Sequence, residues 1–555
     1  MDQPSGALGI ITETDVEMPM RDGVVLRGHV FRPDSPGQFP GLLMRTPYGK
    51  PAAGFERYVR AGYVVVSQDT RGRYASDGEF TIFSEETLDG QDGYDSIEWL
   101  ADQPYCNGDV GTMGVSYNAW MQWQAARLRP PSLKAMCANS IPVELTEVDW
   151  PGAFRPGRRI RWWMTTIAPD LRKREGLPPP HAPAEASAIW EELEHGRWLG
   201  FMPWIDICKY FPKRLAEQAE SWLREPNRRA WRFDEAHAEI DVPNLDFSGW
   251  YDHCGGTVGH LPGMQKNGRT ALAREQTKLV IGPWNHVSLG ARKVGEIDYG
   301  PQAAIDKDGM TIQWFDHWLK GIDSGIDREP AVRYFVMGAG EWRNADTWPP
   351  EEPDETTLYL RGEAGLSSEA PGDEPPDEYD YDPNDPVPTL WNRALFAGAS
   401  DRRQLDHRQD IINYRTDPLT EALEIAGCPE VVLHAASSAP DTDFFVRLVD
   451  EDPDGPALDV SYGMVRARHR NGYDVEELLT PGEACEFRIR MTPTAIRFAE
   501  GHRIRLEITS SNFPDFDRNH NTGANDLMDA ELRVARQTLI HTSTQPSRIV
   551  LPIAD

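Results

Sequence analysis

Ser116 stands at a position where a serine could act as a nucleophile. A strand-like run, Val110 to Val115, leads into it, and a stretch with helical spacing follows at once. A serine hydroxyl attacks an acyl carbon only with a base in reach, an acid that orients the base and donors for the oxyanion. The ordinary alternative is a serine that caps a helix. The segment has only the first glycine of a Gly-x-Ser-x-Gly turn, because Asn118 stands at the place of the second.

Asp252 and His286 are the candidates for the acid and the base. Each follows an apolar run typical of a buried strand, "LDFSGWY" before Asp252 and "KLVIGPWN" before His286. Open α/β sheets place their sites where strands end and loops begin. His253 and His260 stay open as rival bases, and Asp252 alone could be a turn residue. The order serine, acid, histidine along the chain favours a catalytic triad.

The segments around these residues have the pattern of a mostly parallel sheet. Apolar, β-branched runs predict strands, and one of them alternates like an antiparallel strand, while apolar residues at helical spacing predict helices. Strands that alternate with helices indicate βαβ units and hence the α/β class. The predicted strands are 24–31 (antiparallel), 40–49, 62–72, 110–115, 133–140, 242–253 and 277–286, and the predicted helices are 92–103, 118–128 and 311–321.

The chain is expected to form several domains, because its 555 residues exceed the roughly 250–300 residues at which single cores stop growing. A tryptophan-rich, helical stretch interrupts the α/β pattern. The acidic, proline-rich segment from 351 predicts a long, mostly irregular connection, and the short β-type runs beyond it predict a sandwich or jelly roll. The predicted divisions are an α/β core at 1–149 and 242–350, a helical cap insertion at 150–241 and a C-terminal jelly roll at 351–555.

Charge and composition exclude some classes of function. The formal net charge is −31, whereas nucleic acids and anionic membranes require a basic surface. No apolar run is long enough for a membrane span, and no signal peptide is visible, so we expect a cytoplasmic protein. The six cysteines include no CxxC pair and are expected to be buried thiols, neither a disulfide framework nor a zinc site.

A set of short motifs runs along nearly the whole chain outside the tryptophan-rich insertion. In order they are "MPMRDGVVLRGHVFRP" (18–33), "RTPYGK" (45–50), "QDTRGRYASDGEF" (68–80), "GVSYNAWMQWQAA" (114–126), "GWYDH" (249–253), "GPWNH" (282–286), "WFDHWLKGIDSGI" (314–326), "APDTDFFVRLVD" (439–450) and "SNFPDFDRNHNTG" (511–523). Together they resemble the bacterial cocaine-esterase-like hydrolases of the X-Pro dipeptidyl-peptidase superfamily. The resemblance implies an α/β-hydrolase core, an inserted helical cap and a C-terminal jelly roll.

The same resemblance implies the roles of the site residues. Ser116 would be the nucleophile, His286 the general base and acid, and Asp252 the residue that orients His286. The hydroxyl of Tyr48 and the backbone N–H of Tyr117 would share the oxyanion. Without the family, Tyr48 would be interpreted as a packed aromatic residue. This chemistry needs no metal and no organic cofactor.

The family also accounts for the unusual turn after the serine. Relatives have Gly-x-Ser-Tyr, then a variable residue, then glycine, so Asn118 occupies a variable place. The departure is Ala119, which replaces that glycine. One additional methyl group has a modest expected cost.

Two other polar motifs have structural interpretations. Asp69, Arg71 and Ser76 stand beside a strand end, and we expect Asp69 and Arg71 to pair beneath the site rather than to bind a ligand. Residues 515–521 place Asp515, Asp517, Asn519 and Asn521 at alternate positions, as in a calcium loop. His520 occupies the place that needs glycine and the glutamate at the twelfth place is missing, so we expect an anchor between jelly roll and hydrolase core.

The stretch "FRPGRRIRWW" of the insertion contains four arginines beside two tryptophans. We expect a solvated helix face on which the arginines pair with the protein's own carboxylates. The second hypothesis is that one arginine binds a substrate carboxylate at the mouth of the pocket. The residues concerned are Arg155, Arg158, Arg159, Arg161, Trp162 and Trp163.

We predict a serine hydrolase that cleaves the carboxylic ester of a small organic molecule through an acyl-enzyme. Amide cleavage by an acylase or aminopeptidase stays open, as does hydrolysis of α-amino-acid esters, which needs a carboxylate cluster for the substrate ammonium. A remote alternative of another class is a binding module with a dead site. Assembly into a homo-oligomer also stays open.

Overall fold

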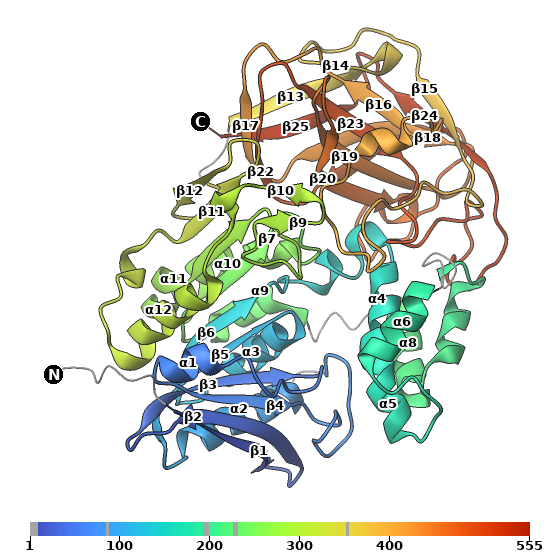
Figure 1. The fold of residues 1–555 in the computed structure, drawn as a ribbon. Helices are drawn as coiled ribbons and strands as arrows, with labels where there is room; N and C mark the ends of the chain where they lie inside the picture. Colours follow the sequence, from blue (N-terminus) through green and yellow to red (C-terminus); the bar gives the residue numbers. More distant parts are fainter. Residues whose placement is uncertain (1–8, 85–87, 193–198, 226–230, 351–353, 555) are drawn as a thin grey trace.

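The computed structural model of the chain describes residues 9–84, 88–192, 199–225, 231–350 and 354–554. Trp198, one of the tryptophans of the tryptophan-rich stretch, and the predicted domain boundary at 351 lie outside the described residues. In Figure 1 an α/β core occupies the lower and left part, a group of helices stands at the right, and a β-rich part forms the top. None of the helices in the described ranges has the length and apolar character needed to cross a membrane.

The core sheet places the three candidate catalytic residues at one edge. Its strands β3, β4, β5 and β6 pair in parallel, and β1 and β2 pair antiparallel at one side. A parallel bridge from Met136 to Asn244 joins it to a second sheet, in which β7, β8 and β11 are parallel. The order is β1 (Ile10–Pro19), β2 (Val25–Pro33), β4 (Val64–Asp69), β3 (Phe39–Thr46), β5 (Cys106–Val115), β6 (Leu133–Asn139), and then β7 (Leu245–Gly249), β8 (Lys278–Gly282), β11 (Val332–Val336), β12 (Glu341–Ala345).

Because parallel strands present their carboxyl ends on the same edge, the residues after β5, β7 and β8 come together. Ser116 follows β5, Asp252 follows β7 and His286 follows β8. The strands are rigid because both faces are covered: Leu43 and Val66 pack into one core, and Leu42 and Val65 pack into another on the opposite face. The helices of the core are α1 (Glu56–Arg60), α2 (Leu88–Ala101), α3 (Tyr117–Arg127), α10 (His260–Asn267), α11 (Ala271–Gln276) and α12 (Lys307–Lys320).

The predicted α/β class is confirmed. The acidic, proline-rich segment is not mainly irregular, however, because it contains β13 (Asp354–Arg361), β14 (Gly365–Ser367) and β15 (Asp377–Tyr381). Strand β13 pairs with β25 (Arg548–Ile553) and β15 pairs with β24 (Ala535–Ile540), residues far along the chain, whereas β14 pairs with β13. The prediction of an irregular connection failed because the composition of this segment does not reveal strand partners that lie more than 150 residues further along the chain.

The tryptophan-rich insertion is helical and lies between β6 and β7. Helix α4 continues directly into a single π-helical turn and then into α5, so the segment that carries the arginines has an irregular register. The elements are α4 (Gly157–Trp162), the π-turn η3 (Trp163–Ile167), α5 (Ala168–Arg174), α6 (Pro183–Glu192), η4 (Trp204–Tyr210), α8 (Lys213–Arg224) and α9 (Phe233–Ala236). We call this part the cap; the exact limits at 150, 242 and 351 stay a prediction.

The C-terminal part is a β domain. In the described residues its 13 strands are joined by hydrogen bonds into one continuous sheet. Its inner face shares a core with β8 and β11, so it packs directly on the α/β core. The remaining strands are β16 (Ile412–Arg415), β17 (Leu423–Gly427), β18 (Glu430–Ser437), β19 (Asp443–Glu451), β20 (Ala457–Arg466), β21 (Cys485–Arg490), β22 (Thr494–Phe498) and β23 (Arg503–Thr509).

The motif at 515–521 fastens the β domain to the cap. Asp517 pairs with Arg155 at 3.0 Å and with Arg466 at 3.2 Å, and all three are buried. Asn519 and Asn521 bond to other protein groups. The motif therefore anchors the β domain, but to the start of the cap rather than to the hydrolase core. The side chains of Asp517, Asn519 and Asn521 make protein contacts, whereas both carboxylate oxygens of Asp515 are buried without a hydrogen-bond partner among the described residues.

The cysteines are all free. Cys106, Cys137, Cys208 and Cys254 are buried, as expected, whereas Cys428 and Cys485 are partly exposed. The prediction of buried thiols was therefore wrong for the last two. Both lie in the β domain, Cys428 just before β18 and Cys485 at the first position of β21, where strand ends leave side chains partly open.

Removal of the Asp517 carboxylate should destabilise the protein strongly. Asp517→Ala leaves Arg155 buried without its ion partner, and loss of one member of a buried pair costs about 3–5 kcal/mol. We expect a clear drop in the thermal midpoint measured by calorimetry. Asp380→Ala is the matched control, since Asp380 pairs with Arg536 on the surface, where a pair contributes about 0–1 kcal/mol. A drop no larger than that of the control would contradict the anchoring role.

Candidate active site

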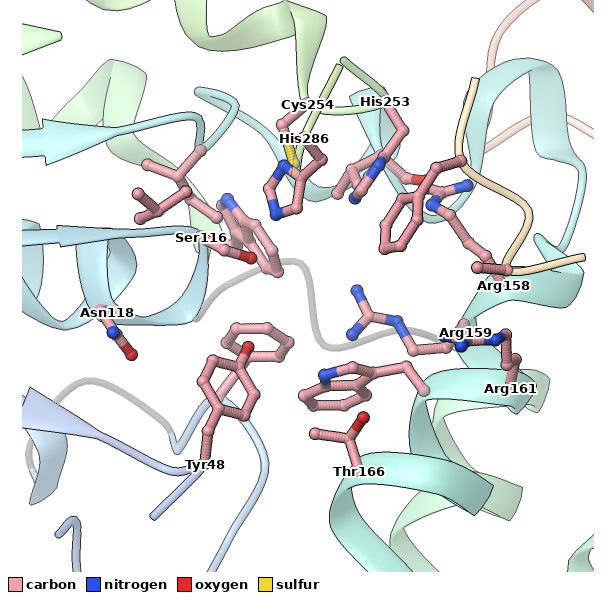
Figure 2. Close-up of a pocket in the computed structure, with 18 residues that line it drawn as sticks. Tyr48, Ser116, Asn118, Arg158, Arg159, Arg161, Thr166, His253, Cys254 and His286 are labelled. Atoms are coloured by element: carbon pink, nitrogen blue, oxygen red, sulfur yellow. The ribbon is translucent and has the colours of Figure 1, made fainter. Parts of the chain in front are cut away.

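Ser116 occupies a strained turn between β5 and α3. Its backbone has φ 64° and ψ −125°, a combination that L-residues rarely adopt. Its side chain makes no capping hydrogen bond to the helix, so the capping alternative is wrong. The backbone is fixed instead: the Ser116 N–H donates to Asn139 O at 2.9 Å, and its carbonyl accepts from Trp120 N at 2.9 Å. The hydroxyl is therefore free to project into the adjoining cavity (Figure 2).

The glycine that this turn requires is Gly114. Its φ is 148°, and a Cβ added there would lie 2.5 Å from the Cβ of Asn118. The chain can reverse so sharply only because that atom is missing. Ala119, the departure from the family pattern, is fully buried in α3. The turn therefore forms with an alanine at this place.

His286 and Asp252 are joined by a hydrogen bond. His286 Nδ1 lies 2.9 Å from Asp252 Oδ1, and the same oxygen accepts from the backbone N–H of Cys254 at 2.8 Å. Asp252 is buried, and the His286 side chain is 11% exposed. With Nδ1 held by the carboxylate, Nε2 is the nitrogen left for chemistry. Figure 2 shows the imidazole beside Ser116.

His253 is placed less well for a role as base. Its Nδ1 lies 3.9 Å from Asp252 Oδ1, beyond hydrogen-bond distance, and has no partner among the described residues. Burial lowers the pKa of His253 well below its usual value, and Arg158 and His286 lower it further. His253 does line the cavity, with its ring 4.3 Å from that of His286.

His260 has a structural role. Its Nδ1 lies 3.0 Å from His237 Nε2, and its Nε2 lies 3.0 Å from Ile141 O. The ring stacks on Trp123 at 4.2 Å, and burial lowers the pKa of His260 well below its usual value. Of the three histidines, His286 alone has an Asp252 hydrogen bond among the contacts of the described residues.

Tyr48 presents its hydroxyl to Ser116 (Figure 2). Burial raises the pKa of Tyr48 to about 12, against the charge of Arg159 and hydrogen bonds with the Ser116 and Trp162 side chains, which lower it. The phenol is therefore protonated at neutral pH and can donate a hydrogen bond. Tyr48 therefore differs from a packed aromatic residue, because its hydroxyl is directed at the Ser116 side chain.

Tyr117 can contribute only its backbone. Its hydroxyl accepts from the Phe83 N–H at 2.6 Å, and its ring stacks on Phe83 at 4.2 Å, within the core. Its N–H belongs to the first residue of α3, and the first four N–H groups of a helix have no partner inside the helix. This N–H and the Ser116 hydroxyl thus belong to consecutive residues of one turn.

Arg73 connects the Tyr48 loop to the cap, a contact that the sequence analysis missed. Its side chain is completely buried. Its Nε donates to Pro47 O at 2.8 Å, next to Tyr48, and its terminal nitrogens donate to Ile167 O at 3.0 Å and Thr166 O at 3.3 Å in the π-turn. The motif "QDTRGRYASDGEF" contained Arg73, but nothing local distinguishes it from Arg71.

The expected pair of Asp69 and Arg71 is wrong. Asp69 pairs with Lys50 at 2.6 Å, because Lys50 follows the neighbouring strand β3. Arg71 turns to α2 and pairs with Asp92 at 2.6 Å. The structural interpretation of the motif holds, since the Ser76 hydroxyl donates to Asp69 O at 2.7 Å.

A cavity of about 400 Å³ adjoins Ser116. One part of its lining is aromatic, and another consists of three cap arginines; no aspartate or glutamate is among the described residues that line it. The solvated face expected for the arginines is wrong, because Arg155 and Arg158 are buried. The expected pairing with the protein's own carboxylates is confirmed for Arg155, Arg158 and Arg159. The lining residues used below are Tyr48, Phe83, Ser116, Asn118, Arg158, Arg159, Arg161, Trp162, Thr166, Trp231, His253, His286 and Phe396.

Four side chains at this site could together hold a metal ion. Asp252, His253, Cys254 and His286 each offer a donor atom, and these atoms lie within 4.8 Å of one another. The hydrogen bond between Asp252 and His286 already joins two of the four. A metal in this position would occupy the imidazole and so compete with its use as a base.

Comparison with known proteins supports the fold and assigns a family. Residues 22–288 match the model of the X-Pro dipeptidyl-peptidase S15 family, and residues 324–550 match the X-Pro dipeptidyl-peptidase C-terminal non-catalytic domain. Cocaine esterase of Rhodococcus sp. (strain MB1 Bresler) is 34% identical over 97% of this chain and 98% of its own. The chain belongs to the cocaine-esterase-like serine hydrolases of the S15 family.

Solved structures share this fold over the whole length. An aminopeptidase from a marine sediment Thaumarchaeota archaeon has a TM-score of 0.82 at 24% identity, covering 100% of this chain and 99% of its own. A selenomethionine-labelled α-amino acid ester hydrolase has a TM-score of 0.76 at 23% identity, with coverages of 100% and 98%. As a cocaine-esterase-like hydrolase, the protein is an α/β-hydrolase enzyme that hydrolyses esters with a serine.

Arg73 should act as a positioning residue for Tyr48. Arg73→Met removes the hydrogen bonds to Pro47 and to the cap, and a small displacement of a catalytic group can cost about 10²-fold in rate. We expect kcat for a nitrophenyl ester to fall about 10- to 100-fold with a smaller change in KM, and Arg73→Lys to restore part of the loss.

The matched control for this prediction is Arg174→Met, which removes a partly exposed cap arginine that also bonds to backbone carbonyls. Circular dichroism and thermal midpoints report whether each variant folds. A folded Arg73→Met enzyme with the kcat of the Arg174 control would show that Arg73 does not position Tyr48.

Proposed function

We propose that Ser116, His286 and Asp252 form the catalytic triad and that the substrate is the carboxylic ester of a small, partly aromatic molecule. The observation that carries this proposal is the hydrogen bond from His286 to Asp252 beside the strained Ser116 turn. The residues stand in the order and at the strand ends that α/β-hydrolases use. The name of the relative cocaine esterase supports an ester with an aromatic group.

In the first half of the reaction, His286 Nε2 takes the proton of Ser116 Oγ as the oxygen attacks the ester carbonyl carbon. The Nδ1–H of His286 donates to Asp252, which fixes the tautomer and stabilises the imidazolium. The oxyanion accepts hydrogen bonds from the Tyr48 hydroxyl and the Tyr117 N–H. Tyr48 is a protonated phenol at neutral pH, since burial keeps its pKa above the ordinary value, and its O–H points to Ser116.

The tetrahedral intermediate then collapses, the bond to the alcohol oxygen breaks, and His286 returns its proton to the leaving alcohol. The acyl group stays on Ser116. A water molecule, deprotonated by His286, attacks the acyl carbon through the same oxyanion site. The acid leaves, and the proton returns to Ser116.

The cavity supports a small ester more than the open alternatives. Its volume of about 400 Å³ lies in the range of small-molecule sites. An α-amino-acid ester would bring an ammonium group into a cavity lined by three arginines and, among its described lining residues, by no carboxylate. A dead binding module would have no need for the His286–Asp252 pair. Amide cleavage uses the same machinery and is separated by experiment.

The proposal also covers the kind of partner and the cellular location. The net charge of −31 supports a small molecule rather than nucleic acid as the partner. We propose that the enzyme works in the cytoplasm.

The nucleophile is tested with nitrophenyl esters and the matching anilides, using wild type and Ser116→Ala in parallel. We expect wild type to cleave the esters and the variant to lose about 10⁴- to 10⁶-fold in kcat, as when the serine of a triad is removed. The ratio of ester to anilide activity separates an esterase from an acylase. Equal activity of the two proteins would refute Ser116 as nucleophile.

The base is tested by comparing His286→Ala with His253→Ala, two neighbouring histidines that both line the cavity. We expect the His286 variant to lose about 10³-fold or more in kcat, because proton transfer and Asp252 stabilisation are both lost. The His253 variant should lose far less. A reversed order of the two losses would assign the base to His253.

Tyr48→Phe removes the proposed oxyanion donor, together with the hydrogen bonds of this hydroxyl to the Ser116 and Trp162 side chains. Loss of a single donor of this kind costs about 10²- to 10³-fold in kcat, and we expect KM to change little. Tyr58→Phe is the matched control, since the Tyr58 hydroxyl bonds to Asp308 on another face of the core. Similar kcat values for the two variants would exclude Tyr48 from the oxyanion site.

A further inference from the structure

The cap side of the cavity carries more positive charge than its described surroundings neutralise. Arg158, Arg159 and Arg161 all line the cavity. Within the described residues, Asp149 is the carboxylate that forms ion pairs with this group, at 2.8 Å from Arg159 and 3.9 Å from Arg158. A second buried carboxyl group, Asp515, feels the charge of Arg158, which lowers its pKa against the larger effect of burial. Two buried carboxyl groups therefore face three guanidinium groups.

Two of these arginines are held in place by the protein. Arg158 donates to the carbonyl of Val148. Arg159 forms the ion pair with Asp149 and lies over the Trp162 ring at 4.7 Å. These contacts hold Arg158 and Arg159 in place, and both guanidinium groups remain part of the cavity lining. The same charge reaches the oxyanion side, because Arg159 lowers the pKa of Tyr48 against the larger effect of burial.

Arg161 differs from its neighbours. It has no ion pair and no side-chain hydrogen bond within the described part of the chain, and its Nε is buried without a partner. Burial lowers the pKa of Arg161, and Glu191 opposes this only from beyond ion-pair distance. The Arg161 residue as a whole is partly exposed, but a buried N–H donor such as its Nε is unfavourable unless an anion or a hydrogen-bond acceptor meets it.

We propose that these arginines bind an anionic group of the substrate, so that the preferred substrate is an ester that also carries a carboxylate. A guanidinium offers paired N–H donors that match the two oxygens of a carboxylate. The inference rests on the proposed function and adds the class of substrate. It selects the second of the two hypotheses for the cap arginines and assigns the central role to Arg161.

The arrangement of the cavity fits such a molecule. In Figure 2, Ser116 and His286 lie on one side, Arg158, Arg159 and Arg161 lie on the other, and the Arg159 side chain extends between them. An ester held at Ser116 therefore has its far end directed toward the cap. Aromatic side chains border the path between the two ends, so an apolar spacer can join the ester to the carboxylate.

The test uses two matched pairs of substrates that differ in one charge. The first pair is the nitrophenyl monoester of adipic acid and its methyl ester, with the charge on the acyl group. The second pair is acetoxybenzoate and its methyl ester, with the charge on the leaving phenol. We expect the charged member of at least one pair to have a kcat/KM about 10- to 100-fold higher, the effect of a charge-assisted hydrogen bond.

The assignment to Arg161 is tested by the ratio of charged to neutral kcat/KM. We expect Arg161→Gln to lower that ratio about 10-fold and Arg161→Lys to lower it less. Arg224→Gln is the matched control, because Arg224 lies on α8 of the same cap, is 45% exposed and pairs with Glu220. The control should keep the wild-type ratio.

Two results would overturn the inference: no preference for the charged member in either pair, or equal fold-losses on both members in Arg161→Gln. Ser116→Ala on the same substrates separates this failure from that of the proposed function. If Ser116→Ala is inactive while wild type shows no charge preference, only the substrate class is wrong. If Ser116→Ala retains wild-type activity, the catalytic assignment itself is wrong.

Discussion

The backbone conformation of Ser116 is the constraint on which the rest of the site depends. A non-glycine residue at φ 64° and ψ −125° costs about 1–3 kcal/mol and persists only where its surroundings enforce it. Here the enforcement comes from the hydrogen bond to Asn139 O on β6 and from Gly114, which lets Asn118 approach closely. The same turn exposes the Ser116 hydroxyl and starts α3, so the proposed nucleophile and the proposed oxyanion donor, the Tyr117 N–H, come from one segment.

Buried arginines join the other parts of the molecule to one another. Arg73 joins the loop of Tyr48 to the π-turn of the cap, and Arg155 joins the start of the cap to Asp517 in the β domain. The cap in turn supplies the aromatic and cationic wall of the cavity. Residues from all three parts of the chain therefore line the cavity, although the α/β core alone carries Ser116, His286 and Asp252.

The sequence predicted what is determined locally. Strand character before Ser116, Asp252 and His286 placed these residues at strand ends, and a parallel sheet brings such ends together. The family resemblance added Tyr48, for which no local pattern exists. Long-range contacts were missed or misassigned. Arg73 reaches Ile167, 94 residues away, and Asp517 reaches Arg155, 362 residues away. Lys50 rather than Arg71 meets Asp69 because two strands lie side by side, which the order of residues does not reveal.

The central claim is that Ser116 is the activated nucleophile. Treatment of the native enzyme with a fluorophosphonate, followed by digestion and mass spectrometry, tests it most directly. Fluorophosphonates phosphonylate a serine only when a neighbouring base and an oxyanion site activate it. The account predicts a single adduct per chain, on the peptide that contains Ser116, formed in step with the loss of esterase activity. Loss of activity with the adduct on another residue, or an active enzyme that carries the adduct on Ser116, would contradict it.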